Sequence, residues 1–270
     1  MSKRNSQANK AAARERLKLE RERQAKKDKV RRQVVVAASI VGVLAIAGGV
    51  GYAVMQANKP GEWDAAKDKT LVKPANTTGD DGTTVVIGKP TAKKTLEMYE
   101  DPRCPVCSVF EQQVGATVKK DVDAGKYKIQ FIGATFIDNG SPGVGSKNAL
   151  SALGAALNVS PEAFMEYKAQ LYSAKWHPAE TTDKFKNDDY LIQVADSVPA
   201  LKGNAKFQQA VKEGTFDKWA LTMSKKFDDS GVSATPTLKM DGKKITGANS
   251  ENAPQDPASF TAAIDKALKG

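Results

Sequence analysis

The stretch of sequence that decides the fold spans residues 95–107 and reads TLEMYEDPRCPVC. Residues 95–99 alternate apolar and polar side chains well enough to predict a β-strand. Residues 106–124 repeat apolar side chains three and four positions apart, which predicts an amphipathic helix. Cys104 and Cys107 are therefore expected where a strand ends and a helix begins.

This placement of the two cysteines favours a reactive thiolate. Backbone N–H groups in the first turn of a helix lack partners within the helix, and the helix dipole is positive there. Such a site lowers the pKa of a cysteine from about 8.5 to roughly 3.5–7.5, and the thiolate is the species that attacks disulfides. We expect Cys104, at the exposed helix tip, to form mixed disulfides and Cys107, one turn further, to resolve them. Pro105 is tolerated in a first turn, and Val106 adds no positive charge to the motif.

A second motif, residues 233–237, reads SATPT and precedes a predicted hairpin. Pro236 stands at the start of a predicted strand over residues 237–240, where a proline is permitted. Asp241-Gly242 joins that strand to another at residues 243–246, and Asp-Gly between two apolar runs is typical of a two-residue hairpin.

The remaining elements place a long helical region between two groups of strands. Strands are predicted at residues 83–87 and 127–131, and Gly125 is a plausible end of the first helix. Ser160-Pro161-Glu162 is typical of a helix start, with a capping side chain and a proline in the first turn. Further helices are predicted at residues 146–157, 160–171, 188–198, 205–213, 216–227 and 257–268.

The segment 95–107, followed by Phe110-Glu111, resembles the active-site segment of the DsbA-like thioredoxin-fold family. Residues 235–237 resemble that family's cis-proline loop, and the helices of about 140–230 stand where the family inserts a helical subdomain. The similarity covers about 83–270 and looks closest to the membrane-anchored members of actinobacteria.

The resemblance implies an α/β, thioredoxin-like fold with an inserted helical subdomain, and a protein disulfide oxidoreductase activity that needs no cofactor. It also implies that Pro236 packs against the cysteine pair and that Thr235 flanks the sulfur of Cys104, where its backbone pairs with an extended substrate. The best-known members carry a histidine inside the cysteine motif where this chain has Val106. Thiol chemistry is therefore implied, but a strongly oxidising potential is not.

The N-terminal part predicts a single transmembrane helix before the folded domain. Residues 34–55 are 22 residues without a charge, and about 20 apolar residues span a bilayer core of roughly 30 Å. Arg31-Arg32 precedes them, so the N-terminus is expected in the cytoplasm and the domain outside the cell membrane. A cleaved signal peptide is the alternative. The polar residues 56–82 are predicted to be a flexible linker.

The net charge of +10 belongs to a tail and not to the domain. Residues 1–32 carry 13 Lys or Arg and 4 Asp or Glu, which leaves 28 basic and 27 acidic side chains elsewhere. A nucleic-acid interface is a basic face on a folded domain, so we expect no nucleic-acid partner. We expect the basic cytoplasmic tail, residues 1–33, to set the membrane topology, and it is a candidate for contact with anionic lipid.

The small number of cysteine and histidine residues argues against a metal site and against a purely structural disulfide. Two cysteines and one histidine fall short of the four ligands of a usual zinc site, so no metal is expected. A purely structural disulfide between Cys104 and Cys107 closes too short a loop to contribute much stability.

Five other side chains are expected to pack in the fold or to lie on its surface rather than to take part in the chemistry. His177 is expected to lie on the surface or to pack in the helical subdomain rather than to catalyse. Glu100 and Asp101 are expected to be exposed loop carboxylates, with tuning of a cysteine pKa or proton relay as the alternative. Trp176 and Trp219 are expected in the core.

The predicted function is dithiol–disulfide exchange on exported cysteine-containing proteins, most simply as an oxidase that a membrane redox partner re-oxidises. The same residues would serve a reductase or an isomerase, because the direction depends on the reduction potential. Two other classes remain open, which are a peptide-binding module with incidental cysteines and a membrane scaffold that acts through the basic tail.

Overall fold

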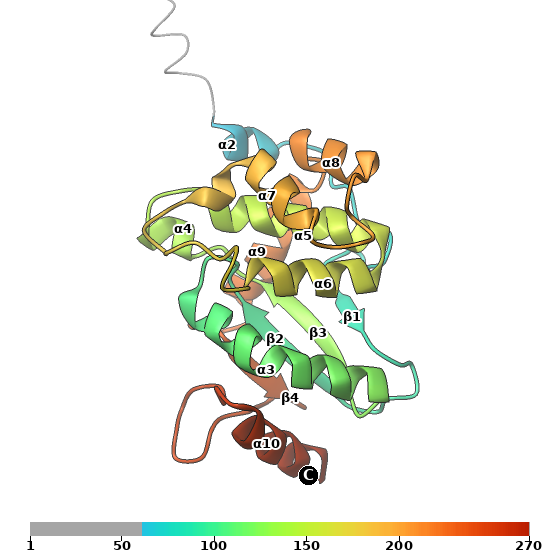
Figure 1. Cartoon of the computed structure of the whole chain (residues 1–270), viewed down its shortest axis with the longest axis vertical. Helices are drawn as coiled ribbons and strands as arrows, with labels where there is room; N and C mark the ends of the chain where they lie inside the picture. The colour runs from blue at the N-terminus through green and yellow to red at the C-terminus, as the bar shows by residue number, and fades with distance from the viewer. Residues whose placement is uncertain (1–60, 270) are drawn as a thin grey trace, which may run out of the picture. The chain divides into compact units, whose positions relative to one another are not determined.

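A five-stranded sheet of order β1-β3-β2-β4-β5 forms the centre of the structure, a computed structural model that describes residues 61–269 (Figure 1). Strands β2 and β3 are parallel, and the remaining neighbours are antiparallel. Parallel neighbours need a crossover, and α3 supplies it between β2 and β3. The strands are β1 (Val85–Ile87), β2 (Thr95–Glu100), β3 (Lys128–Gly133), β4 (Thr237–Met240) and β5 (Lys243–Lys244).

One face of the sheet is covered by α3 (Pro105–Ala124) and α10 (Pro257–Lys269), which pack on each other. Phe110 of α3 meets Phe260 of α10 edge to face, with ring centroids 6.1 Å apart. Leu96 and Met98 of β2 belong to the same buried cluster. The apolar positions that predicted the first helix therefore form the core beneath the strand that leads to the cysteines.

The helical subdomain lies between β3 and β4, as the resemblance implied. Its longest helix, α5, is buried along most of its length, and α9 packs on both α5 and β3. Figure 1 shows α5, α7 and α8 gathered away from α10. The helices are α4 (Ile137–Gly140), α5 (Gly145–Val159), α6 (Pro161–Leu171), the short 3-10 helix η1 (Lys184–Lys186), α7 (Asp188–Ala195), α8 (Ala205–Lys212) and α9 (Asp217–Asp229).

Local signals in the sequence are confirmed at helix ends and at the hairpin. The Ser160 hydroxyl accepts a hydrogen bond from Ala163 N at 3.0 Å and caps α6. Gly125 ends α3 with a left-handed φ of 80°. Asp241 and Gly242 both have positive φ, 52° and 76°, the conformation that a two-residue hairpin requires. The differences are small, such as α7 ending at Ala195 rather than at residue 198.

The prediction of a flexible linker over residues 56–82 is wrong from residue 61 onward. Residues 61–82 include a short helix, α2 (Glu62–Ala66), and lie on the helical subdomain. Trp63 and Leu71 pack against the main core, and the Asn76 side chain donates to Leu157 O at 2.8 Å. This segment contacts the domain through a few scattered apolar residues. Its sequence therefore lacks the periodic apolar pattern that would have predicted packing.

The predicted basic tail, the predicted transmembrane helix over residues 34–55 and residues 56–60 lie outside the described residues. Within residues 61–269, none of the helices combines the length and the apolar character that crossing a bilayer requires. The membrane anchor therefore stays a prediction from sequence.

Candidate active site

The structure brings the two sequence motifs together at the N-terminus of α3. Cys104 is the N-cap residue of that helix, and its sulfur accepts a hydrogen bond from Cys107 N at 3.4 Å. The same sulfur lies 3.4 Å from the carbonyl oxygen of Thr235, 131 positions along the chain. The Thr235–Pro236 peptide bond is cis, and both cysteines are free thiols. Residues 104–107 and 235–236 therefore form one site.

The two thiols of this site differ in acidity. Hydrogen bonds lower the pKa of Cys104 from 9.0 to about 7; the one with the Cys107 side chain is the largest, and the Thr235 side chain and the backbone of Cys107 and Val106 add to it. Burial, followed by the interactions with Cys104 and Glu100, raises the pKa of Cys107 well above 9.0. At neutral pH the proton therefore stays on Cys107, while about half of the Cys104 sulfurs are thiolates. An attack on a disulfide by Cys104 needs this asymmetry.

Cys104 is less exposed than the sequence led us to expect. It is only 6% exposed, and Cys107 is fully buried. Ile137 and Tyr172, which come from the helical subdomain, pack against both cysteines and cover the helix tip. The order of exposure is as predicted, but the expectation of an exposed tip is wrong, because it considered α3 without its neighbours.

Residues that neighbour both halves of the site in the sequence are exposed. Val106 and Val109 of α3 are 50% and 49% exposed, two of the few large apolar side chains that the described residues present to solvent. Ser233 and Ala234, on the loop before Thr235, are also exposed. A narrow approach suffices for disulfide exchange, since one sulfur atom of the partner must reach Cys104.

Glu100 and Asp101 are both fully buried, so the expectation of exposed loop carboxylates is wrong. Lys168 of α6 compensates Glu100, with Nζ 3.0 Å from Glu100 Oε2 and 2.5 Å from Glu111 Oε2. Burial nevertheless raises the pKa of Glu100, and its charge is one of those that raise the pKa of Cys107. Sequence reasoning missed Lys168, because a lysine in an amphipathic helix is usually exposed.

Asp101 is held by three hydrogen bonds, two of which join the turn before Cys104 to the helical subdomain. Its carboxylate accepts from Ser146 Oγ at 2.6 Å, from Arg103 N at 2.9 Å and from Ile137 N at 3.1 Å. Burial raises the pKa of Asp101 to about 6 in spite of these bonds. Asp101 is therefore ionised at neutral pH.

The other candidates lie apart from the sulfurs. His177 packs on the Tyr172 ring, with centroids 5.9 Å apart, and its Nε2 lies 3.1 Å from Pro102 O. Burial lowers the pKa of His177, which keeps the ring neutral at pH 7. Trp219 is fully buried in the core, while Trp176 is half-buried against Tyr190. Across residues 61–269, no three His, Cys, Asp or Glu side chains gather in a group that fits a metal ion.

The acidity of Cys104 predicts a pH profile for alkylation. With iodoacetamide in excess, the alkylation rate of Cys104 is expected to reach half its maximum near pH 7, about 1.5 pH units below an ordinary thiol, because only the thiolate reacts. Mass spectrometry of the modified peptide reports the site. A midpoint of about 8.5 or above would contradict the lowered pKa.

Thr235 predicts a second, smaller effect on the same profile. In the described part of the chain its buried hydroxyl is engaged by no other group, and its hydrogen bonding to the sulfur is one of the causes that lower the pKa of Cys104. The isosteric Thr235→Val removes this donor and is expected to raise the alkylation midpoint by about one pH unit, since a hydrogen bond to a charged group contributes about 1.5–3 kcal/mol. Thr222→Val is the control, because the Thr222 hydroxyl bonds Lys218 O within α9. An unchanged midpoint in Thr235→Val would exclude this role.

The sequence of this chain is similar to those of known proteins. The sequence model of the family described as thioredoxin matches residues 80–266. Disulfide bond formation protein D of Bacillus subtilis (strain 168) is 26% identical over 186 residues, which cover 68% of this chain and 77% of that protein.

Solved structures agree with these sequence matches. The reduced DsbA of Mycobacterium tuberculosis is 25% identical, with a TM-score of 0.54, over 70% of this chain and 98% of that chain. The reduced DsbG of the same organism, described as a disulfide bond oxidoreductase, is also 25% identical, with a TM-score of 0.55, over 74% and 86% of the two chains. MdbA of Actinomyces oris, at 20% identity and a TM-score of 0.61 over 74% of this chain and 94% of that one, shares the fold.

Proposed function

The chain belongs to the thioredoxin family and, within it, to the DsbA-like disulfide oxidoreductases, and from this premise we propose that it oxidises exported cysteine-containing proteins through Cys104 and Cys107. The observation that carries the proposal is the pair of unlike thiols at the tip of α3, one acidic and one buried, with the Thr235–Pro236 loop against the first.

The proposed reaction exchanges one disulfide for another. A substrate thiolate attacks the Cys104 sulfur of the oxidised enzyme, the Cys104–Cys107 bond breaks, and Cys107 leaves and takes up a proton. The second substrate thiolate then attacks the sulfur that is bonded to Cys104. Cys104 leaves as a thiolate, so the substrate dithiol becomes a disulfide and the enzyme becomes a dithiol. A pKa of about 7 makes Cys104 the better leaving group, because thiols of low pKa leave faster.

The substrate segment is proposed to bind beside the 233–235 loop. Thr235 O lies 3.4 Å from the Cys104 sulfur, and Ser233 and Ala234 directly before it are exposed, an arrangement that suits an extended peptide. Val106 and Val109 offer apolar contact on the other border. Exported proteins with unpaired cysteines in extended, partly apolar segments fit this surface.

The direction of exchange depends on the reduction potential, to which the acidity of Cys104 contributes little at pH 7. Lowering the pKa from 9.0 to about 7 stabilises the reduced form by about 0.4 kcal/mol, or roughly 10 mV for two electrons. The preference for oxidation therefore rests on the expected compartment. A redox titration against glutathione tests it, and we expect a potential above the roughly −270 mV of thioredoxin. A value at or below that of thioredoxin would identify a reductase.

The proposed location is the outer side of the cell membrane, with residues 34–55 as a signal-anchor helix and the N-terminus in the cytoplasm. The charge-free segment and the basic residues before it support this orientation. A membrane redox partner would re-oxidise the dithiol, and the basic tail would face anionic lipid. Protease added to intact spheroplasts is expected to remove the domain and to spare the tail. Survival of the domain would place it inside the cell.

A further inference from the structure

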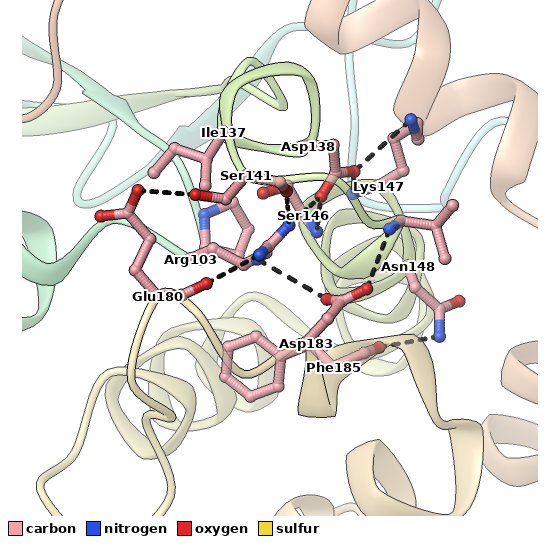
Figure 2. Close-up of polar contacts among 12 residues, drawn as sticks. Arg103, Ile137, Asp138, Ser141, Ser146, Lys147, Asn148, Glu180, Asp183 and Phe185 are labelled. Atoms are coloured by element: carbon pink, nitrogen blue, oxygen red, sulfur yellow. Dashed lines mark hydrogen bonds and ion pairs between the residues drawn. The ribbon is translucent and has the colours of Figure 1, made fainter.

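Arg103, the residue directly before Cys104, is buried and points into the helical subdomain (Figure 2). Its Nη1 donates to Asp138 Oδ1 at 2.9 Å and to Ser141 O at 3.0 Å, and its Nη2 donates to Glu180 O at 2.8 Å. Its Nε lies 3.6 Å from Asp183 Oδ1. One guanidinium therefore connects the turn before Cys104 to two separate segments of the helical subdomain.

The two carboxylates that face Arg103 also fix the start of α5. Asp138 accepts from Ser146 N at 2.9 Å and from Lys147 N at 3.1 Å, two backbone groups in the first turn of that helix. Asp183 Oδ2 accepts from Val144 N at 3.0 Å. The Asp101 and Glu180 carboxylates accept from the hydroxyls of Ser146 and Ser141 in the same region. Lys147 Nζ lies 3.5 Å from Asp138 Oδ2, so two cations face Asp138 and Asp183. These charges compensate each other as long as Arg103 is present.

Two glycines allow the chain to close around this cluster. A Cβ atom on Gly145 would overlap the Asp183 carboxylate, and one on Gly143 would overlap the same carboxylate and come within 2.9 Å of Arg103 Nη1. Any larger residue at these positions would push the 141–145 segment away from the guanidinium. The cluster is therefore closely packed, unlike an exposed ion pair.

We propose that Arg103 is a positioning residue, which docks the turn of residues 101–104 on the helical subdomain and so holds the Cys104 sulfur against the Cys107 amide and the Thr235 loop. This inference deepens the proposed function and rests on it. Arg103 acts through the backbone of the turn, because the hydrogen bonds of its guanidinium within residues 61–269 all go to the helical subdomain (Figure 2).

Loss of Arg103 is expected to raise the pKa of Cys104 through two physical effects. The 3.4 Å contact between Cys107 N and the Cys104 sulfur is sensitive to movement of the turn, since hydrogen bonds weaken steeply as their geometry worsens. Removal of the cation also leaves Asp138 and Asp183 partly uncompensated beside residue 103, the neighbour of Cys104 in the chain, and negative charge near a thiol disfavours the thiolate. Both effects make Cys104 less acidic.

The test compares Arg103→Met and Arg103→Lys in the full chain, with the pH midpoint of Cys104 alkylation as readout. Arg103→Met is expected to raise the midpoint by about one unit or more. Arg103→Lys keeps the charge but loses the fork that reaches Ser141 O and Glu180 O, so it is expected to give a smaller rise. Asp138→Asn weakens the same cluster while keeping Arg103, and it replaces Arg103→Met in this comparison if Arg103→Met does not fold.

Lys69→Met is the matched control. Lys69 Nζ lies 3.2 Å from Asp217 Oδ2, a buried carboxylate that also accepts from Ser151 Oγ at 2.8 Å, away from the cysteines. This variant is expected to lower the unfolding temperature without moving the alkylation midpoint. If Arg103→Lys and Asp138→Asn lose stability but keep the wild-type midpoint, Arg103 is only structural and the inference fails. Absence of disulfide exchange by the wild type would instead refute the proposed function, while the midpoints still test Arg103.

Discussion

Cys104→Ala is expected to abolish disulfide exchange, with a rate loss of at least about a thousandfold, as for other variants that lack their nucleophile. The change removes the sulfur that the tip of α3 and the Thr235–Pro236 loop surround. Reduction of insulin by dithiothreitol and oxidation of a dithiol peptide both measure the activity. The fold should persist, because Cys104 is a small residue that forms no disulfide in this structure. Exchange at the wild-type rate would favour the peptide-binding module, in which the cysteines are incidental.

Cys107→Ala is the matched variant, and it is expected to behave differently. The variant keeps the Cys104 sulfur and its backbone hydrogen bonds but loses the Cys107 side chain that lowers the Cys104 pKa most, so Cys104 attacks a substrate disulfide more slowly, and no second sulfur remains to resolve the product. Mixed disulfides between Cys104 and substrates should therefore accumulate in cells, and mass spectrometry would identify the substrates. If Cys107→Ala formed no mixed disulfides while Cys104→Ala did, the roles of the two sulfurs would be reversed.

The elements around the cysteines were predictable from the sequence, because local patterns specify them. The apolar periodicity of α3, the cap at Ser160 and the Asp241-Gly242 turn each depend on a few neighbouring residues. The pairing of residues 104–107 with residues 235–236 required the family resemblance, since no local signal connects positions 131 residues apart. The order of acidity of the two sulfurs follows from their places on the first helical turn.

Features that depend on distant partners were not predictable. Glu100 and Asp101 have the composition of an exposed turn, yet Lys168 and Ser146 from the helical subdomain compensate them in the interior. Ile137 and Tyr172 cover Cys104 in the same way. The helical subdomain therefore acts on the active-site turn at two points, through Lys168 on Glu100 and through the partners of Arg103 before Cys104.

Lys168→Met is expected to lower the free energy of unfolding by about 3–5 kcal/mol, the usual cost of removing one partner of a buried ion pair. Lys168 is 1% exposed and is the cation shared by the buried Glu100 and the partly buried Glu111, so the variant would leave these two carboxylates without their common counter-charge. Urea unfolding at pH 7 measures the loss. Lys225→Met is the control, because Lys225 pairs with Asp229 on the surface, where a pair contributes about 0–1 kcal/mol.

The sign of the pH dependence separates a loss of charge balance from a loss of packing. Burial already raises the pKa of Glu100 in the folded protein, and removal of Lys168 would raise it further, because the attraction of the cation is lost. A carboxyl whose folded pKa is raised destabilises the fold fully above that pKa, and the penalty declines as the pH falls from the folded pKa toward the unfolded value of about 4.3. The deficit of Lys168→Met should therefore shrink as the pH falls from 7 to 5, and adding Glu100→Gln should restore much of the stability at pH 7. A deficit that stays constant with pH and survives Glu100→Gln would mean that Lys168 stabilises the fold mainly through the packing of its aliphatic stem.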